Sequence, residues 1–203
     1  MKQGSHELFF RKLHSLAGII PVGVFLCFHL FLNYSAVWGK DSYNVASAFM
    51  GNLPFKYALE LFIIFLPLLF HAVYGVHIAL QAKNNVGQFT YARNWMFYFQ
   101  RLTGFIAFAF VIWHVWQTRV QAELGVHVDF DMMAGIVDNP FTLLLYIMGI
   151  LSAIYHFTNG IWTFLITWGI TVSPKSQRIL QYITIGAFFV LSFVGLRAIL
   201  AFI

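Results

Sequence analysis

Four histidines are the residues of this chain whose type and placement best suit chemistry. His29, His71, His114 and His156 each lie inside a different long apolar stretch. Ionisable side chains are costly within a bilayer, so they are rare there and usually functional. Two imidazoles that face each other across a helix bundle can bind the iron of one haem from both sides. The pattern therefore predicts two haem sites with two histidine ligands each.

The elements that must position these histidines are membrane-spanning helices. Hydrophobic residues make up 60% of the 203 and charged residues 9%, which is typical of a polytopic membrane protein. About 20 apolar residues cross a bilayer as a helix. Five stretches qualify, which predicts an all-α fold and one membrane domain over residues 1–203, with a four-helix bundle that holds two stacked haems. The spans are expected at about 13–33, 57–82, 96–118, 141–167 and 179–202, with the fifth outside the bundle.

The distribution of Lys and Arg predicts the orientation of these spans. If the N-terminus is cytoplasmic, eight of the 12 basic residues lie inside and four outside, as the positive-inside rule requires. The C-terminus is then outside. The inner loops, about 83–95 and 168–178, are short, so the cytoplasmic face is expected to be a flat basic platform. No basic run indicates binding to nucleic acid.

The two histidine pairs follow from the depth of each histidine below the outer end of its span. His29 and His114 lie four residues from that end, or about 6 Å at a rise of about 1.5 Å per residue. His71 and His156 lie 14 and 15 residues from it, or about 21–22 Å. His29 and His114 are therefore expected to bind an outer haem, and His71 and His156 an inner haem.

Two glycines lie at the depth of the inner pair. Gly18 and Gly104 stand 15 and 14 residues from the outer ends of their spans, where a missing side chain would leave room for a porphyrin. Two other interpretations of the histidines stay open, namely hydrogen bonds between helices and a proton relay. A metal such as Zn²⁺ is less favoured, because no third or fourth ligand gathers at either depth.

Four further residues are candidates for the sites. His14, Arg93 and Arg101 lie toward the inner ends of their spans and could contact haem propionates, since arginine pairs bidentately with carboxylates. His14 could instead be an interfacial polar residue. Glu60 is the only acid within a predicted span. It could relay a proton to a quinone or could simply extend to water.

Missing motifs limit the chemistry of the chain. Its single cysteine, Cys27, excludes an iron–sulfur cluster held by four thiolates of this chain. No C-x-x-C-H motif is present, so any haem is expected to be non-covalent. No G-x-G-x-x-G fingerprint supports binding of a flavin or nicotinamide. The chain is therefore expected to pass electrons and not to oxidise an organic substrate by itself.

Several segments carry a resemblance to a known family. They are RKLHSLAG at 11–18 with FHL at 28–30, LPFKYALE at 53–60 with FHAVYG at 70–75, WHVW at 113–116 and HFTNG at 156–160. Over essentially its whole length, the chain resembles the cytochrome b membrane-anchor subunit of succinate dehydrogenase, in the five-helix, two-haem form of Gram-positive bacteria such as bacilli. The family's axial ligands fall on the four intramembrane histidines.

The resemblance implies partners and a direction of electron transfer. The implied cofactors are two b-type haems, and the implied partners are a flavoprotein with FAD and an iron–sulfur subunit on the cytoplasmic side of a bacterial cell membrane. Electrons would pass from the inner to the outer haem and reduce menaquinone. The same anchor in a quinol:fumarate reductase and a purely structural anchor remain alternatives. Related fumarate reductases carry a glutamate in the fifth helix, but residues 179–202 contain no acid, so that proton path is not expected.

Overall fold

The computed structural model describes the backbone of residues 2–203 and the side chains of residues 6–203. The side chain of Lys2, one of the eight basic residues assigned to the cytoplasmic side, lies outside that range. All regular structure in the described residues is helical. Five helical segments of the described residues are long and apolar enough to cross a membrane, which agrees with the predicted all-α fold and number of spans; they are His6–Trp38, Lys56–Gln81, Ala92–Glu123, Pro140–Thr167 and Pro174–Leu200.

Three of the spans are interrupted by π-helical turns, whereas the last two are continuous. The first span joins α1 (Lys2–Ala17), η1 (Gly18–Gly23) and α2 (Val24–Tyr34). The second joins α4 (Lys56–Leu59), η3 (Glu60–Phe65) and α5 (Leu66–Gln81), and the third joins α6 (Ala92–Val115), η4 (Trp116–Val120) and α7 (Gln121–Glu123). The fourth and fifth are α9 (Pro140–Thr167) and α10 (Pro174–Leu200). π-Turns often occur at functional sites, and these three adjoin residues of the sites described below.

Local sequence explains where the continuous spans begin. The Asn139 side chain accepts hydrogen bonds from the backbone at the start of α9, and Pro140 occupies the first helical position. At α10, Ser173 and Ser176 cap each other's backbone N–H groups, and Pro174 follows the cap. Side-chain caps satisfy backbone donors that no helix can satisfy internally, and proline needs no such donor.

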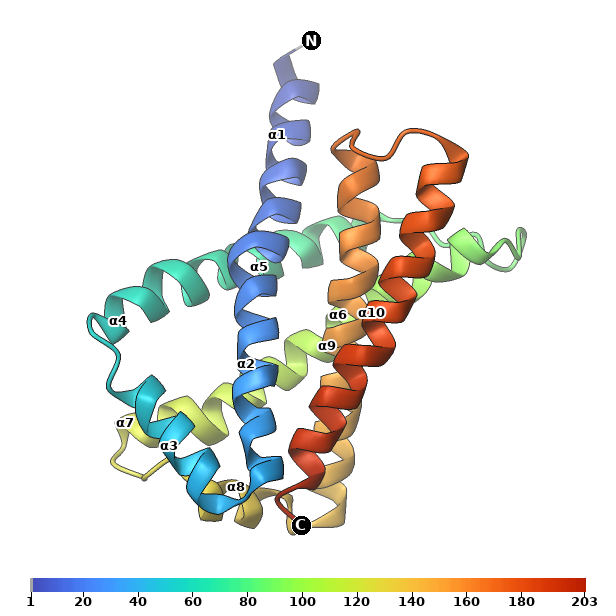
Figure 1. Ribbon diagram of the computed structural model, residues 1–203. Helices are drawn as coiled ribbons and strands as arrows, with labels where there is room; N and C mark the ends of the chain where they lie inside the picture. The colour runs from blue at the N-terminus through green and yellow to red at the C-terminus, as the bar shows by residue number, and fades with distance from the viewer. Residues whose placement is uncertain (1) are drawn as a thin grey trace.

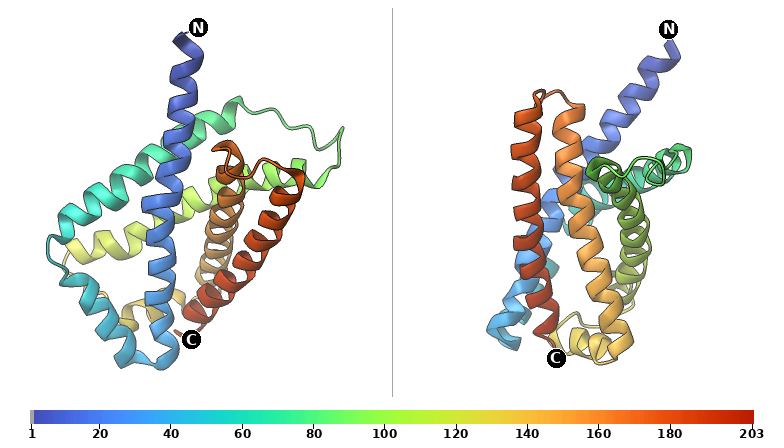
Figure 2. Two further views of the ribbon diagram at one scale, coloured as in Figure 1. Left: turned by 45° about the horizontal axis from the view of Figure 1, so that its top comes forward. Right: turned by 90° about the vertical axis from the view of Figure 1, so that its right-hand side faces the viewer.

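The five spans pack in an order that differs from their order in the sequence. α9 packs extensively against α6 on one side and α10 on the other, α10 also packs against α2, and α1 packs against α5. Figure 1 shows α1 and α2 as one nearly continuous rod, with α5 and α6 running obliquely across it. α10 lies at one edge of the molecule, with α6 and α5 toward the other (Figure 2). The fifth span therefore supports α2 and α9 from outside.

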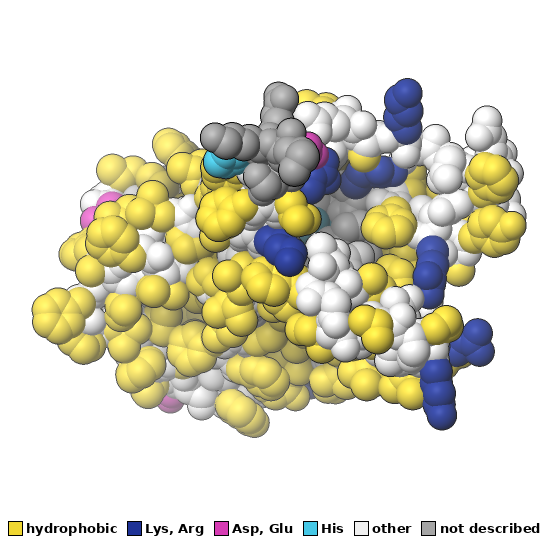
Figure 3. All heavy atoms as spheres, turned by 90° about the horizontal axis from the view of Figure 1, so that it is seen from above, with side chains coloured by type: hydrophobic (Ala, Val, Ile, Leu, Met, Phe, Trp, Pro, Cys, Tyr) yellow, Lys and Arg dark blue, Asp and Glu magenta, His cyan; other side chains and the backbone are white. Residues whose placement is uncertain are grey.

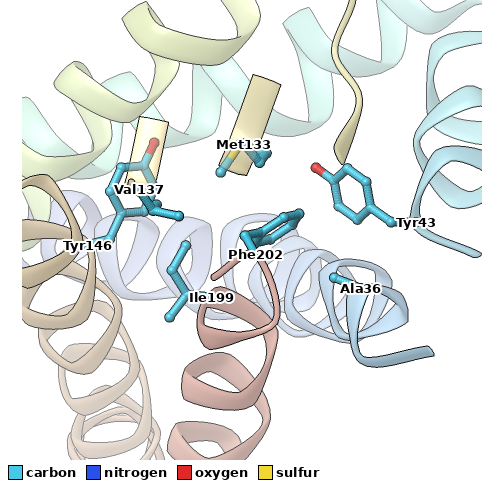
Figure 4. Packing of buried hydrophobic residues seen from close by; sticks show 7 residues of the cluster. All are labelled: Ala36, Tyr43, Met133, Val137, Tyr146, Ile199 and Phe202. Atoms are coloured by element: carbon cyan, nitrogen blue, oxygen red, sulfur yellow. The ribbon is translucent and has the colours of Figure 1, made fainter. Parts of the chain in front are cut away.

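Two short helices, one between the first and second spans and one between the third and fourth, close one end of the molecule. They are α3 (Lys40–Gly51) and α8 (Phe130–Val137), which were not anticipated from the sequence. The rings of Tyr43 and Phe202 lie 5.0 Å apart, and Met133 packs against them in a buried cluster (Figure 4). Lys40 pairs with Asp131 at 2.5 Å. This cluster anchors the C-terminal end of α10 to α3 and α8.

Candidate functional site

The fold brings the four intramembrane histidines together in two pairs. The ring centres of His29 and His114 lie 5.8 Å apart at an interplanar angle of 73°, and those of His71 and His156 lie 5.9 Å apart at 83°. An iron bound to two opposed imidazoles at about 2 Å each would place the ring centres roughly 6 Å apart. Both separations fit one axially ligated haem iron. Within the described residues, no group of three or more His, Cys, Asp or Glu side chains forms a metal site.

Hydrogen bonds fix the tautomer of both inner histidines. Nδ1 of His71 lies 2.9 Å from the carbonyl oxygen of His14, and Nδ1 of His156 lies 3.0 Å from the carbonyl oxygen of Gln100. A carbonyl oxygen can only accept, so each Nδ1 carries the proton. Each Nε2 therefore keeps its lone pair for a metal. Histidines that bind metals usually donate their other ring N–H in this way.

An amide network surrounds His156 and joins α6 to α9. Nε2 of Gln100 donates to the His156 carbonyl at 3.0 Å, and Nδ2 of the buried Asn159 donates to Oε1 of Gln100 at 2.6 Å. Sequence reasoning missed both amides. A signal was available, because polar amides inside apolar spans need partners when they are buried.

The outer histidines have different partners. Nδ1 of His114 lies 3.3 Å from the hydroxyl oxygen of Tyr146, which donates its own proton to Oε1 of Gln117 at 3.2 Å. The hydroxyl therefore accepts from His114, which leaves Nε2 of that ring free. Nδ2 of Asn33 donates to the carbonyl of His29 at 2.8 Å and lies 3.3 Å from Nε2 of the same ring. His29 is thus held by its own helix.

The two glycines at the inner depth face imidazole rings. A Cβ atom added to Gly18 would lie 2.3 Å from Cε1 of His71, and one added to Gly104 would lie 2.9 Å from Cε1 of His156. Each glycine therefore makes room for a histidine of the facing helix. The expected room for a porphyrin is, at these two positions, room for the proposed ligand itself.

The candidate propionate contacts have other partners in this structure. His14 stacks on His71 with ring centres 4.2 Å apart and planes within 4°. Arg93 donates to Oε1 of Gln177 at 3.1 Å and lies over the ring of Trp162, and Arg101 donates to Asn84. His14 thus adjoins the inner pair directly. Contacts of the three side chains with propionates stay a prediction.

Glu60 forms an ion pair that the sequence did not suggest. Oε2 of Glu60 lies 2.7 Å from Nη2 of Arg119, and Nε of Arg119 donates to both carboxylate oxygens at 2.9 and 3.0 Å. Arg119 also pairs with Glu123, four residues later in the same span. Glu60 opens the π-turn of the second span, and Arg119 lies in that of the third. Arg119 was missed because the third span was expected to end at about residue 118, one residue before it.

Comparison with known proteins identifies the family of the chain. The arrangement is that of a multi-pass membrane protein with two histidine pairs suited to haem. Residues 79–195 match the model of the succinate dehydrogenase/fumarate reductase transmembrane subunit family. The chain is 58% identical over 200 residues to the succinate dehydrogenase cytochrome b558 subunit of Bacillus subtilis (strain 168). The aligned region covers 98% of this chain and 99% of that protein. The chain belongs to the succinate dehydrogenase/fumarate reductase transmembrane subunit family.

Proposed function

We propose that the chain is the dihaem cytochrome b membrane anchor of a succinate dehydrogenase and connects its iron–sulfur subunit with menaquinone. The observation that carries this proposal is the two histidine pairs, with ring centres 5.8 and 5.9 Å apart, in a chain that is 58% identical over 98% of its length to a cytochrome b558 subunit. Cytochromes b bind haem. When bound, two haems supply one-electron carriers between the partner subunit and the quinone.

The side chains of this chain hold the cofactors. His71 and His156 present Nε2 for the inner haem, because their Nδ1 atoms are engaged by backbone carbonyls. His114 presents Nε2 for the outer haem, opposite His29. The apolar spans around both pairs exclude water, so that electrons pass only between the bound haems.

The end of the molecule that carries the N-terminus is the proposed docking face for the iron–sulfur and flavoprotein subunits. Lys and Arg side chains are scattered over this end among hydrophobic ones (Figure 3). The basic residues of the two short loops are Lys83, Arg93, Lys175 and Arg178. We propose that the N-terminus is cytoplasmic and the C-terminus outside, so that this face meets the partner subunits on the cytoplasmic side. Charge attraction then guides docking and weakens as salt rises.

The proposed quinone end lies near the outer pair. Reduction of a quinone takes up two protons, so a carboxylate close to the outer pair can act as a relay. Glu60 is held by Arg119, which follows His114 by five residues in the same span. The position of Glu60 is therefore tied to the helix that carries an outer ligand. Whether the complex oxidises succinate or reduces fumarate is decided by assaying both activities, since the family includes both enzymes.

The proposal predicts two non-covalent protohaems per chain in the purified complex. Two opposed imidazoles give a strong axial field, so both haems should be low-spin. Haem content by the pyridine haemochrome assay, together with an oxidised-minus-reduced spectrum, measures this directly. A value of one haem or none per chain contradicts the proposal, and a value of none favours a structural anchor.

The relay role of Glu60 predicts that Glu60→Gln slows menaquinone reduction by roughly a hundredfold, the usual scale for a proton-transfer group. Haem content and reduction of an artificial dye by succinate should be retained, because both precede the quinone. Glu123→Gln is the matched control, since it removes the other carboxylate that pairs with Arg119. Equal quinone kinetics in the two variants would remove Glu60 from the mechanism.

A further inference from the structure

The two histidine pairs differ in what holds the second ring nitrogen of each ligand. Both inner histidines donate to backbone carbonyls. His114 instead has a side-chain partner, the hydroxyl of Tyr146. A backbone carbonyl is present whatever the residue, but a hydroxyl depends on one side chain. A substitution of Tyr146 can therefore remove the hydrogen-bond partner of His114, whereas no substitution removes the backbone carbonyls that bind the inner histidines.

We propose that Tyr146, oriented by Gln117, is a positioning residue for the outer haem: it fixes the tautomer and ring plane of His114 and thereby sets the reduction potential of the iron that His114 binds. The inference rests on the proposed function, in which His114 is an axial ligand. Tyr146 and Gln117 then orient the His114 ring, a role that the spacing of the histidines alone does not predict.

The direction of each hydrogen bond supports this assignment. The Tyr146 hydroxyl oxygen lies 3.2 Å from Oε1 of Gln117 and 3.3 Å from Nδ1 of His114. Its single proton is donated to Gln117, so its lone pairs face His114. His114 can then satisfy the hydroxyl only by carrying a proton on Nδ1. That tautomer leaves Nε2 as the metal-binding atom.

The packing of Tyr146 fixes the place of its hydroxyl. Its residue is 2% exposed, and its ring contacts Phe110 and Trp113 with centres 5.3 Å away in each case. Val137 and Ile199 belong to the same buried cluster, and the hydroxyl points away from Ile199 (Figure 4). A ring enclosed on these sides has little freedom to move its hydroxyl away from His114.

The local backbone explains how Gln117 reaches the same hydroxyl. Gln117 follows His114 by three residues, so both side chains lie on the helix face that meets α9. The π-turn Trp116–Val120 begins directly after Val115 and includes Gln117. One face of the third span thus supplies both the ligand and the group that orients the ligand's partner.

A hydrogen-bond acceptor at Nδ1 makes an imidazole ligand more basic and favours the ferric over the ferrous state of a bound haem. Loss of the hydroxyl in Tyr146→Phe should therefore raise the midpoint potential of the outer haem and leave that of the inner haem unchanged. Gln117→Leu should give a smaller shift in the same direction, because the hydroxyl loses its own acceptor and becomes a weaker partner for His114.

The test uses the assembled complex with potentiometric titration of both haems and electron paramagnetic resonance of their low-spin ferric forms. Tyr146→Phe keeps the packed ring, so the fold is preserved. Tyr155→Phe is the matched control: Tyr155 precedes His156 in α9, and its hydroxyl makes no hydrogen bond within the described residues. The control should leave both potentials and both ferric signals unchanged.

The outcomes separate the inference from the proposed function. An upward shift of the outer potential with a changed outer ferric signal supports the role of Tyr146, as does selective loss of the outer haem. Unchanged signals in Tyr146→Phe, or equal shifts in both haems, overturn it. If the unaltered complex and His114→Ala have the same haem content, His114 binds no haem, and the proposed function itself has failed.

Discussion

His71→Ala and His156→Ala should each remove the inner haem, and His29→Ala and His114→Ala should each remove the outer one. Each variant is expected to keep one haem of two, because an iron held from two helices loses its axial pair when either ligand is lost. The structure supports this division, since the members of each pair face each other at 5.8 and 5.9 Å. Haem content and difference spectra of the purified complexes measure it.

A fifth histidine supplies the control for this series. His77 lies six residues after His71 in α5, is exposed, and contacts Gln81 of its own helix at 3.0 Å. His77→Ala should therefore retain both haems. If His29→Ala and His71→Ala lost the same haem, the pairing of α2 with α6 and of α5 with α9 would be wrong.

Gly18→Ala should displace His71 and cost the complex its inner haem. The added Cβ would lie 2.3 Å from Cε1 and 2.5 Å from Nδ1 of His71, far inside contact distance. The ring would have to move, and its hydrogen bond to the His14 carbonyl would break. Overpacking of this kind costs about 1–3 kcal/mol in addition to the lost ligand geometry. Haem content and the thermal unfolding midpoint of the complex report the two effects.

Alanine at two other glycines should cause a smaller loss of the inner haem or none. Gly104→Ala brings Cβ to 2.9 Å from His156, so a smaller loss of the same haem is expected. Gly186→Ala in α10 meets nothing within 4 Å and should leave haem content unchanged. Full retention of the inner haem in Gly18→Ala would mean that the close approach of η1 to His71 does not position the ligand.

The spans and the meeting of the histidines were predictable because both depend on quantities that a sequence contains. A helix rises by a fixed amount per residue, so His29 and His114 could be placed at one depth and His71 and His156 at another. The apolar length needed to cross a bilayer gave the number of spans. The partners of Nδ1 were not predictable, because they depend on how each helix is rotated and tilted against its neighbour.

The ion pair between Glu60 and Arg119 shows a different limit. The third span was expected to end near residue 118, but the helical segment continues to Glu123 through a π-turn. This five-residue difference in the boundary moved Arg119 into a loop and left Glu60 without a visible partner. The helices α3 and α8 were missed in a similar way, since their amphipathic character gives a weak signal beside that of the membrane spans.

The crossing pattern of the pairs has a consequence for biosynthesis. Each proposed cofactor joins spans that are not neighbours in the sequence, the first with the third and the second with the fourth. A nascent chain with two inserted spans therefore holds one half of each ligand set and can complete neither. Insertion of the third span completes the outer set, and only the fourth completes the inner set. With this pairing, acquisition of both haems would follow the membrane integration of the first four spans.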